Sequence, residues 1–98
     1  MATFIATLRF TEQGARAIGE STKRAAAFKA TAKKLGVKVT AQYWTLGAVD
    51  GVMIADAPDD AAMTAAMLAL AGEGNVRTTT ARAFDAAEFA KLIGGGKK

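Results

Sequence analysis

The chain has 98 residues, a hydrophobic fraction of 51% and a formal net charge of +4, which suits one domain with a modest core and excludes disorder as its main state. It contains neither cysteine nor histidine, which excludes disulfides, thiol nucleophiles, cysteine or histidine metal ligands and a histidine general base. No apolar run approaches the roughly 20 residues of a membrane-spanning helix, and the first residues do not resemble a signal peptide. We expect a cytoplasmic protein that uses no cofactor and no metal.

The order of strand and helix patterns along the chain predicts the fold class. The pattern predicts a strand over 2–10, a short helix within 11–18, a helix over 22–35, a strand over 37–46, a turn over 47–50, a strand over 51–56, a helix from Pro58 to about Gly72, a strand over 75–84 and a short helix through Ile93. Ser21 is a candidate N-cap, and Asp85 with Glu88 forms a capping box. We expect one domain over 1–93 and a flexible tail over 94–98.

The βαββαβ order with a trailing helix predicts an α+β, ferredoxin-like fold, in which a four-stranded antiparallel sheet carries its helices on one face. Apolar side chains occur on both faces of the predicted strands, and Ile5, Trp44 and Met53 are expected on the helix-free face. Since a solvated face normally alternates with polar residues, we expect a homodimer that stacks sheet to sheet, like the dimeric α+β barrels. The alternative is a monomer with scattered surface hydrophobes.

Several short motifs occur in a fixed order: Thr11-x-Gln13-Gly14, Ser21-x-x-Arg24, Tyr43-Trp44-Thr45-Leu46-Gly47, Asp50, Ala57-Pro58-Asp59-Asp60 and Gly74-Asn75-Val76-Arg77-Thr78-Thr79-Thr80. With these motifs the chain resembles the GYD family of small bacterial and archaeal proteins, from about Ala2 to Leu92. The resemblance implies a ferredoxin-like fold, association through the sheet and no established activity. The chain departs from the family pattern at Val49, where relatives have a tyrosine, and at Thr22, where they have a proline, so no role of that tyrosine hydroxyl carries over.

Few residues are candidates for chemistry. Asp50 follows the central turn, where an aspartate usually accepts backbone N–H bonds, but it is also the candidate general base or ligand-binding carboxylate. Arg77 and Thr79 share a strand face and are either ordinary strand residues or the donors for a small anionic ligand, with Arg77 able to pair with Asp50. Trp44 is either buried in a core or interface or forms a pocket wall.

Two function hypotheses follow from these candidates. The first is a homo-oligomeric binding or assembly module without catalysis, whose partner is the chain itself, as a homodimer or a higher oligomer through the helix-free sheet face. The second is a cofactor-independent enzyme of the dimeric α+β barrel kind that acts on a small carbonyl or aromatic compound through Asp50 and Arg77. The missing histidine favours the first. The basic residues between Lys23 and Lys38 are typical of a solvated helix face, so nucleic acid is not the expected partner.

Overall fold

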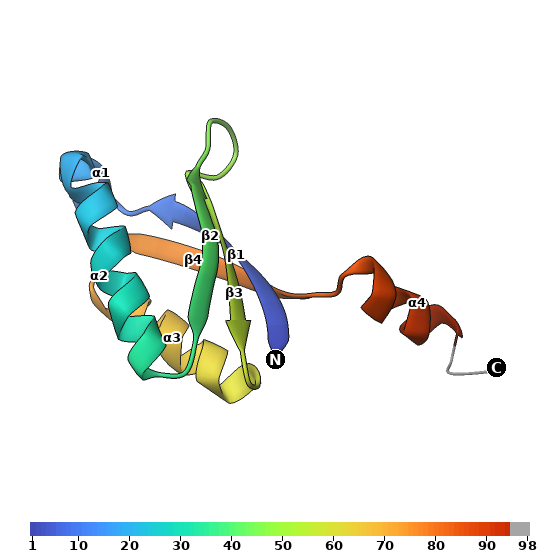
Figure 1. Cartoon of the computed structure of the whole chain (residues 1–98). Helices are drawn as coiled ribbons and strands as arrows, with labels where there is room; N and C mark the ends of the chain where they lie inside the picture. The colour runs from blue at the N-terminus through green and yellow to red at the C-terminus, as the bar shows by residue number, and fades with distance from the viewer. Residues whose placement is uncertain (95–98) are drawn as a thin grey trace.

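Residues 1–94 are described by a computed structural model, in which helices pack against a four-stranded antiparallel sheet (Figure 1). The elements are β1 (Ala2–Phe10), α1 (Glu12–Arg16), the 3-10 helix η1 (Ile18–Glu20), α2 (Ser21–Lys34), β2 (Lys38–Trp44), β3 (Gly51–Ala57), α3 (Asp60–Gly72), β4 (Val76–Ala83) and α4 (Ala86–Gly94). The strand order β2-β3-β1-β4, with every neighbouring pair antiparallel, confirms the predicted ferredoxin-like fold. The tail predicted over 94–98 lies outside the described residues from position 95 onward.

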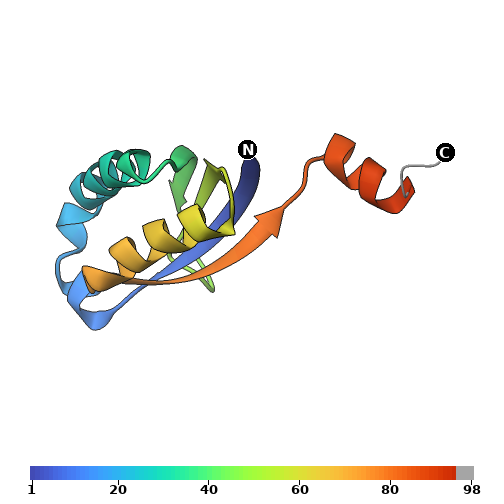
Figure 2. The ribbon, with the colours of Figure 1, turned by 90° about the horizontal axis from the view of Figure 1, so that it is seen from below.

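The core lies between one face of the sheet and the helices α2 and α3, which cover that face together (Figure 2). Its members are apolar and mostly small: Phe4, Ala6, Leu8, Phe28, Ala32, Val37, Val39, Met53, Ala55, Ala57, Met63, Ala66 and Leu70. Five of these thirteen residues are alanine, whose small side chain allows a helix to approach the strands closely. Among residues 1–94, no helix covers the opposite face of the sheet, which we call the helix-free face.

The predicted alternation of the second strand is wrong beyond Val39, because β2 contains an irregularity between Val39 and Ala41. A bulge inserts an additional residue into one strand and so exchanges the faces on which the later side chains lie. Trp44 therefore lies on the helix-covered face and not, as expected, on the helix-free face. Its neighbour Tyr43 points to the opposite side and is exposed.

The prediction that Met53 lies on the helix-free face is also wrong, because Met53 is a core residue with only 1% of its surface exposed. Along β3 the buried residues are Gly51, Met53, Ala55 and Ala57, and the partly exposed residues between them are Val52, Ile54 and Asp56. Ile54 pairs with Ile5 across β1 and β3, so these two side chains lie together on the helix-free face. Because Val52, Met53 and Ile54 are all apolar, the sequence does not indicate which of them faces the helices.

The starts of two helices differ from the prediction. Ser21 is the first residue of α2 rather than its N-cap, and its hydroxyl donates a hydrogen bond to the Ile18 carbonyl, because the preceding 3-10 turn runs directly into the helix. The helix α3 begins at Asp60 and not at Pro58, because Asp59 is its N-cap and accepts the Ala62 N–H at 2.8 Å. The predicted capping box of α4 is confirmed, since Asp85 and Glu88 each accept the other's backbone N–H.

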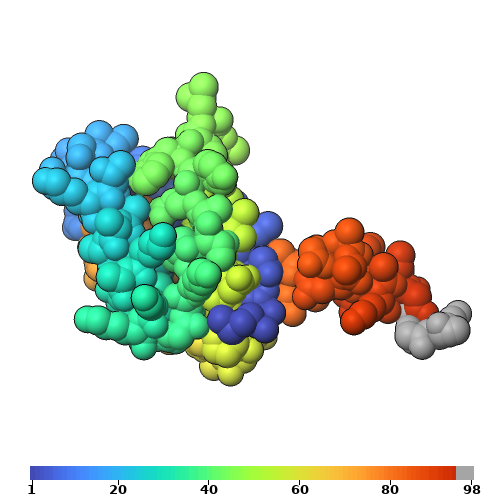
Figure 3. Space-filling model, viewed as in Figure 1, coloured from blue at the N-terminus to red at the C-terminus, as the bar shows by residue number. Residues whose placement is uncertain are grey.

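The C-terminal helix α4 stands apart from the body of the molecule. The chain continues beyond the end of β4 and carries α4 away from the sheet and from α2 and α3 (Figures 1 and 2). In the space-filling view α4 forms a separate lobe (Figure 3). None of the helices within residues 1–94 is both long and apolar enough to cross a membrane.

Candidate functional site

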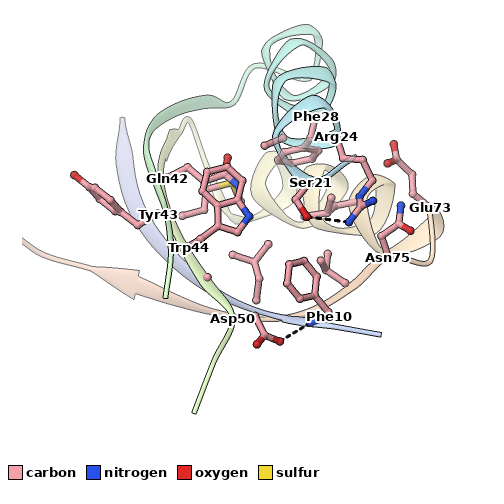
Figure 4. A pocket seen from close by; sticks show the side chains of 16 residues that line it. Phe10, Ser21, Arg24, Phe28, Gln42, Tyr43, Trp44, Asp50, Glu73 and Asn75 are labelled. Atoms are coloured by element: carbon pink, nitrogen blue, oxygen red, sulfur yellow. Dashed lines mark hydrogen bonds between the residues drawn. The ribbon is translucent and has the colours of Figure 1, made fainter. Parts of the chain in front are cut away.

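A cavity of about 50 Å³ lies between the first turns of α2, the strands β1–β3 and the end of α3 (Figure 4). Its wall is mainly apolar and aromatic, with Phe10, Phe28 and Trp44 pointing into it. The polar residues at its rim are Ser21, Arg24, Gln42, Glu73 and Asn75. Small-molecule sites usually enclose roughly 300–1,000 Å³, so this cavity holds a few atoms or waters and not a substrate of ordinary size.

Asp50 lies beside this cavity but is bonded to the backbone of β1. Its Oδ2 accepts the Phe10 N–H at 2.8 Å, and its own N–H donates to the Leu8 carbonyl at 2.8 Å. Figure 4 shows the carboxylate directed toward the Phe10 N–H. These bonds hold the start of β3 against the end of β1, which is the structural interpretation of a turn aspartate.

The other predicted site residues do not gather around Asp50. Arg77 and Thr79 share a face, as predicted, because they pair with Arg9 and Thr7 of β1 on the helix-free face. Neither residue lines the cavity, and the ion pairs formed within residues 1–94 do not include one between Arg77 and Asp50. The structure therefore brings Trp44 and Asp50 to the cavity and places Arg77 and Thr79 on a different surface.

Arg24 is a residue at the cavity that the prediction of the site did not include. Its guanidinium donates to the carbonyls of Ala17 at 2.7 Å and Gly14 at 3.4 Å, and it contacts the Ser21 hydroxyl at 3.3 Å. Ser21 and Arg24 are three residues apart on α2, so their side chains lie on neighbouring parts of one helix face. The motif Ser21-x-x-Arg24 could have indicated that Arg24 belongs to this site. In the structure its two side chains bind carbonyls of the turn before α2.

The motifs that begin at Thr11 and at Gly74 are distant in sequence, and hydrogen bonds join them in the structure. Thr11 donates from its backbone N–H to the Asn75 carbonyl at 3.0 Å and from its hydroxyl to the Gly74 carbonyl at 2.6 Å. Gln13 donates to the Asn75 side chain at 2.9 Å. A Cβ atom on Gly14 would lie 2.0 Å from the Asn75 carbonyl oxygen, so only glycine fits there. These contacts fix the entry to β4 against the exit from β1.

The helix-free face is the second candidate site. Its centre is apolar, formed by Ile5, Ala41, Tyr43, Val52, Ile54 and Ala81. Arg9 and Arg77 lie directly opposite each other at one end of it. Within residues 1–94, no group of three or more acidic side chains could hold a metal ion.

The family model for the GYD domain matches residues 4–93. A protein of Thermus thermophilus, named "Glutamine synthetase and cystathionine beta-lyase binding protein", is 36% identical over 90 residues, which are 91% of this chain and 95% of the relative. No solved structure matches the chain. The family match and this relative, together covering nearly the whole chain, confirm the resemblance: the chain belongs to the GYD domain family.

Proposed function

We propose that this chain is a protein-binding module without catalytic activity, which forms a homodimer through its helix-free face and binds partner enzymes in that form. The observation that carries the proposal is the relative from Thermus thermophilus, which is named for binding two enzymes and aligns over 95% of its own length. By this likeness, glutamine synthetase and cystathionine beta-lyase are the first partners to test. We also propose that the protein acts in the cytoplasm.

Self-association is supported by the composition of the helix-free face. Ile5 is 37% exposed, and Val52 and Ile54 beside it are partly exposed although they are apolar. An antiparallel sheet that faces water normally shows polar residues at such positions. Two sheets can stack about 10 Å apart with interdigitating side chains, and a two-fold axis would cover the same face on both copies.

The enzyme alternative rests on Asp50 and Arg77 and receives less support from the geometry. The Asp50 carboxylate already accepts a backbone N–H, and Arg77 belongs to a different surface. The small cavity beside Trp44 leaves little room for a carbonyl or aromatic substrate.

The experiment combines an oligomer measurement with a binding measurement. Sedimentation equilibrium of the full chain should show a dimer, and Ile54→Ser should weaken it at least about tenfold, since a large apolar contact is lost. Leu68→Ser is the matched control, because Leu68 is an exposed apolar residue of α3 on the helix-covered side. Immobilised glutamine synthetase and cystathionine beta-lyase should each be tested for binding the native chain and both variants.

The outcomes are distinct. A native chain that stays monomeric at millimolar concentration contradicts the proposed dimer. A dimer that neither enzyme binds contradicts the proposed partners. Equal weakening of the dimer by Ile54→Ser and Leu68→Ser contradicts the choice of the helix-free face.

A further inference from the structure

We infer that α4 is an arm that binds a second copy of this chain, so that each copy in the proposed dimer contributes both its helix-free face and its α4. The inference rests on the proposed self-association. It assigns a role to a helix that has no other explanation in the fold, because α4 packs against none of the sheet, α2 or α3 (Figures 1 and 3).

The sequence of α4 specifies a helix with one apolar side. Phe89, Leu92 and Ile93 follow a three- and four-residue spacing and form one stripe. Glu88 and Lys91 are three residues apart and form a polar strip beside it. A surface helix of a globular protein has this pattern when its stripe faces a core.

No other part of residues 1–94 covers the apolar stripe of α4. Phe89, Leu92 and Ile93 are 53%, 57% and 72% exposed, and no residue of α4 is buried. An isolated helix shorter than roughly 12–15 residues is marginal in water, and α4 has nine. The reciprocal bonds of Asp85 and Glu88 define where α4 begins, but they do not replace a packing partner.

The size of the helix-free face argues for a second copy as the occupant. The four strands have seven to nine residues and span a plane of roughly 500 Å², whereas a stable interface buries about 800 Å² of accessible surface on each partner. A contact confined to the two sheets is therefore of modest size. An arm from each copy enlarges the interface, and its stripe is covered in the same step.

The placement of the arm also fits an exchange between copies. Only Phe84 and Asp85 separate β4 from α4, and the chain leaves the sheet in the direction in which β4 runs (Figure 2). The connection therefore carries α4 past the end of its own sheet. In a two-fold arrangement each arm extends beyond its own body, where the other copy can receive it.

The first test compares two variants of the full chain by sedimentation equilibrium. The double variant Phe89→Ser/Leu92→Ser removes most of the stripe, and Lys91→Gln on the polar strip is its control. We expect the double variant to raise the dimer dissociation constant at least about tenfold and the control to change it less than about twofold. Neither variant should change the unfolding of the body, because α4 does not pack against it.

A dimer whose dissociation constant is the same in the double variant and the native chain overturns the arm inference and leaves the proposed function standing. A native chain that is monomeric at millimolar concentration overturns both.

The second test identifies what α4 touches. Phe89 is replaced by the photoreactive analogue p-benzoylphenylalanine, and the full chain is irradiated above its dimer dissociation constant. We expect a covalent product of two chains, whose cross-linked peptide joins residues 86–94 of one copy to another part of the second copy. Cross-links formed only within one chain, or none at all in a sample that is dimeric, overturn the inference.

Discussion

The two faces of the sheet are built from alternate residues of the same strands, yet they have different surroundings. Met53 points into the core under α2 and α3 and is almost completely buried, while its neighbour Ile54 points to the helix-free face and stays partly exposed. The helices α2 and α3 cover one face, and within residues 1–94 no helix covers the other. A strand with apolar residues on both sides thus has one side buried by its own chain, and we propose that a second copy buries the other.

The largest loss of stability is expected from a substitution on the helix-covered face. Met53→Ala should lower the free energy of unfolding by about 2–5 kcal/mol, because it leaves a cavity in a closely packed core. Ile54→Ala on the other face should cost less than about 1.5 kcal/mol in the monomer, since that side chain is already partly hydrated. Urea unfolding below the dimer dissociation constant measures both, and equal losses would show that the two faces do not differ as described.

The next effect concerns Asp50, which holds the start of β3 against the end of β1. Asp50→Ala should cost about 1–3 kcal/mol, because the Phe10 N–H loses its acceptor. Asp50→Asn keeps an oxygen acceptor and should recover part of this loss. Urea unfolding gives the stability, and sedimentation equilibrium should show an unchanged dimer. Full stability of Asp50→Ala would contradict the structural role of this carboxylate.

A smaller loss of stability is expected from a substitution in the helix layer that leaves the dimer interface intact. Asp59→Ala removes the N-cap of α3 and should cost about 1 kcal/mol. The dimer dissociation constant should not change, because α3 lies on the helix-covered side (Figure 2). Thermal unfolding and sedimentation equilibrium check the two statements separately, and a weaker dimer in Asp59→Ala would indicate that the helix layer takes part in association.

The smallest expected effect is that of salt on the dissociation constant of the proposed dimer. Arg9 and Arg77 lie opposite each other on the helix-free face, so a dimer brings four guanidinium groups to one interface. Added sodium chloride screens their repulsion and should leave the dimer unchanged or strengthen it by up to about threefold. Light scattering across a salt series measures this, and a dimer that dissociates in high salt would show that ionic attraction holds it.

The element order and the fold could be predicted from the sequence because several boundaries have a local signal. Gly36 ends α2, Asp59 caps α3, and the capping box starts α4, and all three depend on residues a few positions apart. The sequence did not allow us to predict in the same way which residues of β2 and β3 face the helices. The irregularity between Val39 and Ala41 is set by pairing with β3, and no residue within β2 indicates it.

The site could be predicted only in part, because a motif indicates that a residue matters and not what it touches. Asp50 lies where the turn pattern places it, and one of its two predicted roles matches its bonds to Phe10 and Leu8. Arg77 is separated from it because β4 pairs with β1 and turns Arg77 to the helix-free face. The contact of Arg24 with the turn before α2 depends on the path of the chain in three dimensions.

The helix-free face as the dimer interface can be tested most directly with two adjacent residues. Tyr43 is the only tyrosine and Trp44 the only tryptophan, and they lie on opposite faces of β2. The chain is labelled with 3-fluorotyrosine and, separately, 5-fluorotryptophan, and ¹⁹F NMR spectra are recorded as it is diluted from millimolar to micromolar concentration. The Tyr43 signal should shift as the dimer dissociates, while the Trp44 signal stays nearly constant. A Tyr43 signal that does not move, or a larger shift at Trp44, would contradict an interface on the helix-free face.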